Sequence, residues 1–139
     1  MFLGNSFGKN LDILHRTMDA STLRQQVLAN NVANADTPNF KRSEVNFEAQ
    51  LKRALESEKQ QPRVAVETTD PRHISNVKSM DYRDVEPRRR LDYLSTSDNN
   101  GNNVDIEQES MLLLQNQLRY QLLARSVSGK FSRVKMVLR

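Results

Sequence analysis

Apolar residues near the N-terminus recur at the alternating three- and four-residue spacing of a helix that packs along one seam. They are Leu11, Leu14, Met18, Leu28 and Val32, and Ser21, Gln25 and Ala35 occupy the remaining places of the seam. Neither Gly nor Pro interrupts residues 9–34. The pattern therefore predicts a helix over 9–35, roughly 40 Å long at a rise of 1.5 Å per residue. A helix of that length with so thin an apolar stripe requires a partner.

A proline ends this predicted helix. Pro38 disfavours helical backbone at Thr37, so the helix is expected to stop near Asn34. Pro38 and Asn39 suit the two central positions of a turn, because Asn tolerates positive φ at the second of them, and Phe40 follows as an apolar anchor. Beyond the turn, a second set of apolar positions predicts a short helix over roughly 44–57: Val45, Phe47, Leu51, Ala54 and Leu55. Residues 36–57 are thus interpreted as a turn and a short helix.

The middle of the chain, residues 58–103, differs in character. Residues 64–69 and 91–94 are candidates for short strands, and prolines at 62, 71 and 87 and the polar run 95–103 surround them. We interpret this region as an extended, partly irregular segment with at most a small β-hairpin.

A second long helix is predicted over 104–138. Asn102 or Asn103 is expected to cap its N-terminus. Asp105, Glu107 and Glu109 are expected to place negative charge at the positive end of the helix dipole. One apolar stripe comprises Met111, Leu114, Leu118 and Leu122, and another comprises Leu113, Tyr120, Ala124, Val127, Phe131, Val134 and Leu138. Gly129 is expected to mark a bend or a close helix contact.

These elements predict a mainly α fold in which the two terminal helices pair as an antiparallel coiled coil. The helices 9–35 and 104–138 together form the core domain, 36–57 follows the first helix, and 58–103 is a variable middle segment. The N-terminal seam covers one C-terminal stripe and leaves the other exposed. An exposed apolar surface of that extent is typical of an interface.

Composition supports a subunit that completes its apolar burial with other chains. The chain has 139 residues, enough for one domain, but only 37% are hydrophobic and none is Trp. The net charge of +4 permits an acidic partner without requiring one. The absence of Cys excludes disulfides and thiolate sites. The longest apolar run, residues 111–114, is far short of a membrane span, and the start of the chain lacks the pattern of a secretory signal.

The sequence carries no recognisable catalytic constellation. His15 and His73 are isolated from other metal ligands, and the four glycines are too scattered for a phosphate loop. We therefore expect no enzyme, no cofactor, no metal site and no small-molecule substrate. Arg88, Arg89 and Arg90 form the one compact basic cluster. It is interpreted either as a solvated loop or as a contact for phosphate or an acidic partner.

The segment Leu28-Ala-Asn-Asn-Val-Ala-Asn-Ala-Asp-Thr-Pro-Asn-Phe-Lys-Arg42 resembles the N-terminal signature of flagellar basal-body rod and hook proteins, which usually have Gly where this chain has Asn39. Further stretches resemble the proximal-rod members of that family. They are Glu44-Val-Asn-Phe-Glu-Ala-Gln-Leu-Lys52, Gly101-Asn-Asn-Val-Asp-Ile-Glu-Gln-Glu109, Leu118-Arg-Tyr-Gln121 and Ser128-Gly-Lys-Phe131.

The resemblance implies a structural subunit that polymerises helically into the periplasmic rod and transmits torque. It implies export through the flagellar type III apparatus without a cleaved signal peptide. The implied partners are further copies, other rod subunits, the inner-membrane ring and its small rod adaptor protein, with no nucleic acid among them. The alternatives are another rod subunit of the same family or, in a different class, a small basic helical module that binds nucleic acid or membrane.

The residues expected at assembly interfaces come from the seam, the signature and the stripes of the second helix. They are Leu11, Leu14, Met18, Leu28, Asn30, Asn31, Val32, Asn34, Thr37, Pro38, Phe40, Met111, Leu114, Leu118, Tyr120, Leu122, Val127 and Phe131. The three asparagines are expected to bond to adjacent backbone or to neighbouring chains, or simply to be solvated at the helix end.

Overall fold

A computed structural model describes residues 6–59, 80–95 and 101–138 of the chain. It divides into two compact units, one built from residues 1–45 and 87–139 and the other from 46–86. Each unit has its own elements and is described by itself.

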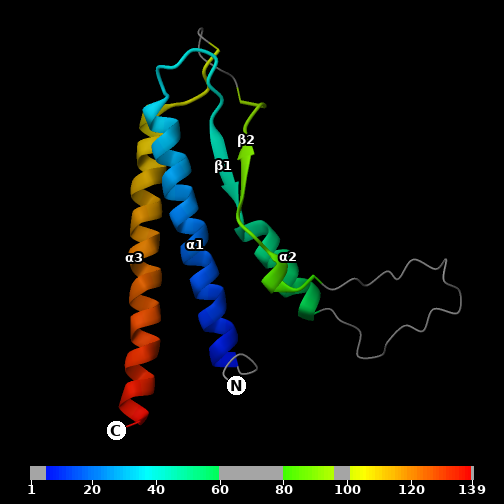
Figure 1. Cartoon of the computed structure of the whole chain (residues 1–139), viewed down its shortest axis with the longest axis vertical. Helices are drawn as coiled ribbons and strands as arrows, with labels where there is room; N and C mark the ends of the chain where they lie inside the picture. Colours follow the sequence, from blue (N-terminus) through cyan, green and yellow to red (C-terminus); the bar gives the residue numbers. More distant parts are fainter. Residues whose placement is uncertain (1–5, 60–79, 96–100, 139) are drawn as a thin grey trace, which may run out of the picture. The chain divides into compact units, whose positions relative to one another are not determined.

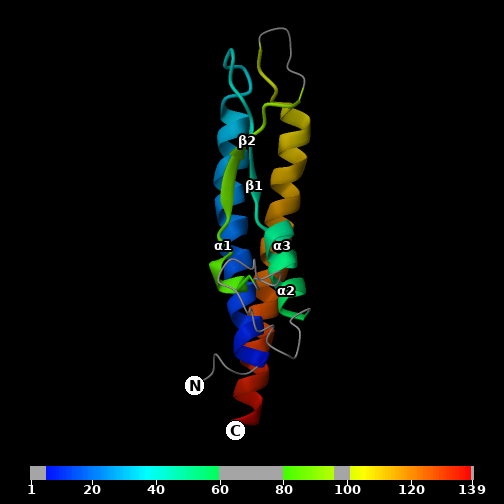
Figure 2. The ribbon, with the colours of Figure 1, turned by 90° about the vertical axis from the view of Figure 1, so that its right-hand side faces the viewer.

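Two long antiparallel helices form the body of the first unit. Helix α1 spans Ser6–Ala33 and helix α3 spans Ile106–Val137, and they lie side by side along most of their length (Figures 1 and 2). The predicted mainly helical fold with paired terminal helices is confirmed. The first helix begins three residues before the expected start at 9, and the second begins two residues after 104.

The side chains buried in this unit are mostly polar. Its buried apolar residues are Ala20, Val27, Leu28 and Val104, whereas its buried polar residues are Ser21, Asn31, Ser43, Asn102, Asn103, Glu109 and Asn116. Leu11, Leu14, Met18 and Val32 of the predicted seam are half-buried. Hydrogen bonds therefore contribute to the specificity of the helix pair alongside apolar packing.

One of these buried groups fills the polar gap in the middle of the α1 seam. The Asn116 amide of α3 donates to the Ser21 carbonyl at 2.9 Å and to Gln25 Oε1 at 3.1 Å, and Asn116 Oδ1 accepts from the Ser21 hydroxyl at 3.1 Å. A buried polar contact of this kind favours one register of two helices, because sliding either helix leaves its groups unpaired.

The small β structure consists of two antiparallel strands, β1 (Ser43–Asn46) and β2 (Arg88–Leu91) (Figure 1). Strand β1 stands where the helix over 44–57 was expected to begin, so that prediction was wrong for residues 44–46. Hydrogen bonds from the Asn31 side chain hold Ser43 in an extended conformation. The local spacing of apolar residues gives no sign of such contacts between distant residues.

Strand β2 overlaps the candidate strand at 91–94 only at Leu91. The Asp92 carboxylate accepts the N–H groups of Leu94 and Ser95, which forms a turn and ends the strand early. The other candidate strand, at 64–69, lies outside the described residues.

The second unit contains helix α2 (Glu48–Lys59) and a short 3-10 helix, η1 (Tyr82–Asp84), which contact each other. Among its described residues, 46–59 and 80–86, those that are buried are all apolar or aromatic, unlike those of the first unit: Phe47, Leu51, Ala54, Tyr82 and Val85. The Ser57 hydroxyl accepts the Met80 N–H at 3.1 Å, and Asp81 caps η1 by accepting from the Arg83 N–H. This unit thus has its own small apolar core.

The N-cap of α3 differs from the one expected. Asp105, and not Asn102 or Asn103, caps the helix by accepting the N–H groups of Glu107 and Gln108 at 2.9 and 3.2 Å. Both asparagines are engaged elsewhere, as described below. Gly129 makes no close helix contact within the described chain, because a Cβ built there would meet no atom within 4 Å.

The buried contact at Asn116 yields the first prediction. Replacing Asn116 with Ala should lower the free energy of unfolding by about 1–3 kcal/mol, because it leaves the Ser21 hydroxyl and the Gln25 amide oxygen without this partner. Urea titration followed by circular dichroism measures the change. Gln121→Ala, at an exposed position of the same helix, should change it by less than about 0.5 kcal/mol. Equal stability of the two variants would contradict the role given to Asn116.

Candidate assembly site

The signature segment forms a tight turn directly after α1. The Phe40 N–H donates to the Thr37 carbonyl at 3.3 Å, and Asn39 has a φ of 60°. Pro38 and Asn39 therefore occupy the two central positions of the turn, as predicted. The Asn34 amide donates to the Asn30 carbonyl one turn earlier at 2.8 Å.

A buried asparagine from the other end of the chain holds the end of α1. Asn102 is 0% exposed, and its amide nitrogen lies 3.0, 2.6 and 2.9 Å from the carbonyl oxygens of Asn34, Ala35 and Thr37. Carbonyl groups at a helix C-terminus lack hydrogen-bond partners within the helix. Here the amide of one side chain donates to three carbonyl groups that directly follow α1. Asn102 Oδ1 also accepts the Val104 N–H at 2.8 Å. Asn102 thus joins the end of α1 to the approach of α3.

The residue before it has a backbone conformation that favours glycine. Gly101 has a φ of +78°, and a Cβ added there would lie 2.6 Å from Asn39 Oδ1. Its carbonyl accepts from Lys41 Nζ at 2.9 Å. The positive φ therefore favours glycine, and a larger residue would also have to displace the end of the Asn39 side chain.

Asn103 makes a second bridge, to the strand region. Its Oδ1 accepts the Arg42 N–H at 2.7 Å, and its amide donates to the Asp92 carbonyl and to Ser95 Oγ, both at 2.9 Å. The Asp92 N–H in turn donates to the Arg42 carbonyl at 2.9 Å. The start of β1 and the end of β2 are thus held by one side chain that precedes α3.

A third bridge lies deeper. The Asn31 side chain pairs with the backbone of Ser43 like a neighbouring strand: its amide donates to the Ser43 carbonyl at 2.9 Å and its oxygen accepts the Ser43 N–H at 3.0 Å. The same amide donates to Glu109 Oε2 at 2.9 Å. Asn31 is 0% and Glu109 1% exposed, so these bonds are shielded from water. One asparagine therefore links α1, β1 and α3.

Charged side chains around Arg42 complete this network of contacts. Arg42 Nε lies 3.6 Å from Glu109 Oε1 and 3.7 Å from Asp92 Oδ2, and the guanidinium also pairs with Glu44. Within the described chain, neither Arg42 Nε nor Glu109 Oε1 has a hydrogen-bond partner, so their attraction is that of an ion pair without a hydrogen bond. The buried Glu109 carboxylate is thereby balanced by a nearby positive charge. We call Asn31, Arg42, Asn102, Asn103 and Glu109 the polar joint.

In contrast to the polar joint, an apolar stripe along α3 is exposed. Met111, Leu114, Leu118 and Leu122 are 72%, 57%, 53% and 64% exposed. At 100° per residue, Leu118 lies about 200° around the helix from the buried Asn116. This exposed stripe therefore faces away from α1, on the opposite side of α3.

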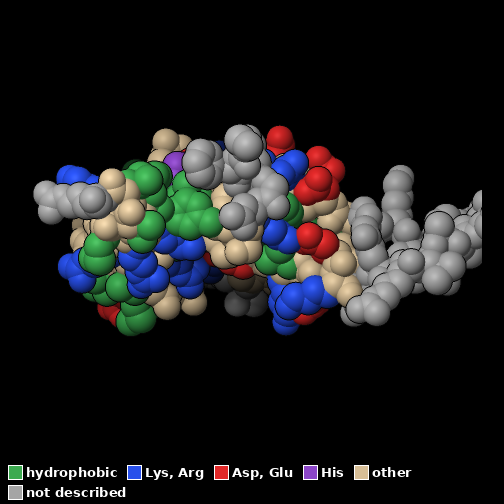
Figure 3. All heavy atoms as spheres, turned by 90° about the horizontal axis from the view of Figure 1, so that it is seen from below, with side chains coloured by type: hydrophobic (Ala, Val, Ile, Leu, Met, Phe, Trp, Pro, Cys, Tyr) green, Lys and Arg blue, Asp and Glu red, His purple; other side chains and the backbone are tan. Residues whose placement is uncertain are grey.

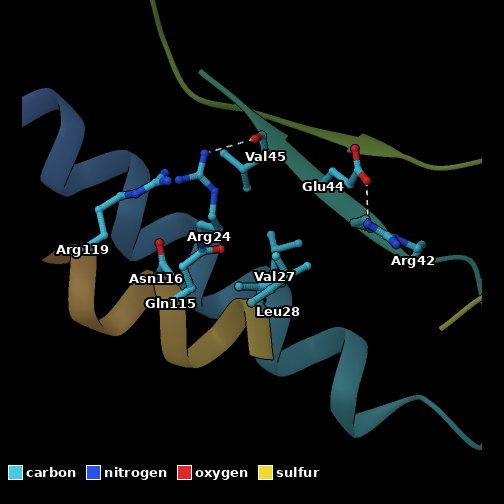
Figure 4. A pocket seen from close by; sticks show the side chains of 11 residues that line it. Arg24, Val27, Leu28, Arg42, Glu44, Val45, Gln115, Asn116 and Arg119 are labelled. Atoms are coloured by element: carbon cyan, nitrogen blue, oxygen red, sulfur yellow. Dashed lines mark hydrogen bonds and ion pairs between the residues drawn. The ribbon is translucent and has the colours of Figure 1, made fainter. Parts of the chain in front are cut away.

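Several grooves lie along the helix pair, including the following two. An apolar groove of about 410 Å³ is lined by Phe7, Gly8, Leu11, Asp12, His15, Phe131 and Val134, where α1 begins and α3 ends. Figure 3 looks at this end of the chain and shows hydrophobic side chains gathered beside Lys and Arg. The second groove, of about 250 Å³, lies between α1, β1 and α3, and in it Arg24 donates to the Val45 carbonyl at 3.3 Å (Figure 4).

Comparison with known proteins decides the family. Residues 11–41 match the family model described as flagella basal body rod protein. The chain is 42% identical to flagellar basal body rod protein FlgB of Borreliella burgdorferi over 97% of its own length and 99% of that protein's. It is 44% identical to FlgB of Borrelia hermsii over the same shares, and 32% identical to FlgB of Bacillus subtilis over 95% of each chain.

The chain belongs to the FlgB family of flagellar basal body rod proteins. The family is structural and its members are not enzymes. Within the described residues, no group of three or more His, Asp or Glu side chains is arranged to hold a metal ion. None of the described helices combines the length and the apolar character needed to cross a membrane.

In this FlgB family member, the predicted interface residues fall into distinct environments. Leu28 and Asn31 are buried; Leu11, Leu14, Met18, Val32, Asn34, Phe40 and Val127 are half-buried; Asn30, Thr37, Pro38, Tyr120 and Phe131 are exposed, as is the stripe of α3. Leu11 and Phe131 line the same groove. Asn34 makes the expected bond to adjacent backbone, whereas Asn31 bonds to the backbone of Ser43, twelve residues away, and to Glu109. His15 is exposed, whereas His73 lies outside the described residues.

Sequence reasoning missed most of the polar joint of this FlgB family member. Glu109 was interpreted as a charge that compensates the helix dipole, and Asn102 and Asn103 as helix caps. One signal was available: Glu109 and Asn116 are seven residues apart and fall on one face of α3, where a polar pair between apolar residues indicates buried partners. The Arg88, Arg89 and Arg90 cluster forms the exposed strand β2, with Arg89 Nε donating to Ser43 Oγ at 3.0 Å.

Gly101 gives a matched pair of glycine predictions. Gly101→Ala should lower the free energy of unfolding by about 1–2 kcal/mol, because alanine is strained at positive φ and its Cβ would displace the Asn39 side chain. Gly129→Ala should instead raise it by about 0.5–1 kcal/mol, since Gly129 lies in open space within α3. Urea titrations of both variants measure these changes. Destabilisation of similar size in both would contradict the close approach at Gly101.

Asp92 gives a prediction of pH dependence. Hydrogen bonds from the Ser95 hydroxyl and the Leu94 N–H, with a further contribution from Arg42, lower the pKa of Asp92 below its ordinary value of 3.8. A carboxylate whose pKa is depressed on folding stabilises the fold above its unfolded pKa, and this is lost as the pH falls through the folded pKa. Stability should therefore fall below pH 3.8. Comparing unfolding of the wild type and Asp92→Asn from pH 7 to pH 2 tests this, because the variant should lack this part of the decline.

Proposed function

We propose that this chain is a subunit of the proximal rod that polymerises helically into the drive shaft and transmits torque across the periplasm. Its partners would be further copies of itself, other rod subunits, the inner-membrane ring and the small rod adaptor protein. The flagellar type III export apparatus would carry it, without a cleaved signal peptide.

The observation that carries the proposal is that α3 has two distinct faces. One faces α1 and contains the buried Asn116 and Glu109, and the opposite face carries the exposed stripe of Met111, Leu114, Leu118 and Leu122. A monomer rarely exposes so continuous an apolar row without a binding role. Neighbouring chains in an assembly would cover it.

The polar joint supports a mechanical role. It connects α1, the turn after it, β1 and the start of α3 through bonds that are mostly shielded from water. Short-range hydrogen bonds resist displacement because each loses its energy within a fraction of an ångström of stretching. A subunit whose two long helices are fixed to each other in this way could pass a twisting load from one neighbour to the next.

Leu118 is the position that tests this proposal. Leu118→Asp should abolish rod assembly and swimming while export of the chain continues, because a carboxylate at the centre of the stripe cannot be buried against a neighbour. Complementation of cells that lack the native copy, with basal bodies examined by electron microscopy, measures the outcome. Normal swimming of the Leu118→Asp strain would refute the assembly role of the stripe.

Ser126→Asp serves as the control for this experiment. Ser126 is exposed on the same helix but lies about 80° around it from Leu118. It should fold, be exported and assemble. Circular dichroism of both purified variants separates a loss of assembly from a loss of folding, because neither substitution removes a buried group.

A further inference from the structure

The exposed stripe of α3 is bracketed by two opposite charges. Glu107 precedes it and Arg125 follows it, 18 residues later, which is five helical turns or about 27 Å. Five whole turns place both residues on the same side of the helix as the stripe. Both are exposed, and neither forms an ion pair with any residue in the described ranges.

The order of residues along the stripe is close to symmetric about position 116. Glu107 and Arg125 are equally far from it, as are Leu114 and Leu118, and Met111 and Leu122 differ by one residue. In an antiparallel pair of identical helices centred there, Leu114 would lie level with Leu118 of the second copy. Glu107 would lie level with Arg125 of the second copy, and this contact would occur twice.

Other arrangements of two copies give poorer charge pairing or less overlap of the apolar stripes. A parallel pair in register would bring Glu107 against Glu107 and Arg125 against Arg125 of the second copy, which is repulsive. A parallel pair displaced by five turns would match the charges but would separate the two stripes along the axis. Only the antiparallel pairing overlaps the apolar residues fully and also brings opposite charges together.

The margins of the stripe fit the same arrangement. Ser110, Gln115 and Gln121 flank it and carry no charge, so these three side chains would not repel an identical helix. Two such stripes would bury on the order of 1,000 Å², the low end for a specific interface between proteins. The contact should therefore be reversible and of moderate affinity.

We propose that the free subunit pairs with a second copy of itself through the exposed stripe of α3, in an antiparallel contact with two Glu107–Arg125 ion pairs. This contact is isologous and closed, so it cannot propagate into a filament. It uses the same side chains as the proposed helical assembly, so a paired subunit cannot enter the rod through that face. Pairing would keep the assembly face covered until other rod subunits compete for it.

Sedimentation velocity on the full-length chain tests the pairing over about 1–500 μM. The wild type should dimerise with a dissociation constant in the tens of micromolar. Leu118→Asp should weaken the dimer at least about 50-fold, and Glu107→Arg or Arg125→Glu alone about tenfold. The double variant E107R/R125E should return to within about threefold of wild type, because the two charges are exchanged. A wild-type chain that stays monomeric throughout the range overturns the proposal.

The control for charge reversal is Asp19→Arg, which makes the same change at an exposed position of α1 and should leave the dimer unaffected. Circular dichroism of Glu107→Arg checks that the first turn of α3 still forms. A double variant that dimerises no better than the single ones overturns the ion pairs. Because this test needs only the purified chain, its failure is distinct from failure of assembly in cells.

Cysteine pairing fixes the orientation, since the natural chain has no Cys. A mixture of Glu107→Cys chains and Arg125→Cys chains should form a disulfide-linked heterodimer on oxidation, at least about tenfold faster than Glu107→Cys chains pair with themselves. The reverse result would indicate a parallel pair and would overturn the antiparallel contact.

Discussion

The register between α1 and α3 is the constraint on which the rest of the first unit depends. Two helices with thin apolar seams could slide along each other with little loss of apolar contact. Asn116 and Glu109 prevent this, because each reaches across from α3 to groups of α1 that are buried with it. A slip of one turn would leave several buried polar atoms without partners, at a cost larger than that of the apolar rearrangement. The register in turn determines which side of α3 faces outward.

The polar joint extends this constraint to the connections. Asn102 and Asn103, which are neighbours in sequence, hold the turn after α1 and the strands respectively. Arg42 connects the same region to the buried Glu109. The long polypeptide between α1 and α3 therefore returns to a fixed point before α3 begins. A FlgB-family subunit can in this way carry a long connection between its two helices without loosening the pair.

The sequence was informative where structure depends on neighbouring residues. The length of α1, the turn at Pro38 and Asn39 and the two-sided apolar pattern of α3 all follow from spacing and backbone preference. It was uninformative where structure depends on a partner far away. Strand β1 forms because Asn31, twelve residues earlier, pairs with Ser43, and Asn102 meets carbonyl groups more than 60 residues before it. The exposed stripe was thus predictable, whereas the polar joint was not, because its members resemble ordinary helix caps and surface charges.

The polar character of the interface between α1 and α3 also bears on how the subunit responds to temperature. The heat capacity change of unfolding rises with the apolar surface exposed and falls with the polar surface exposed. A first unit whose buried groups are mostly amides, hydroxyls and charges should therefore have a small heat capacity change for its size. Its curve of stability against temperature would be shallow, so that the free energy of unfolding of the helix pair would change little between cold and warm surroundings.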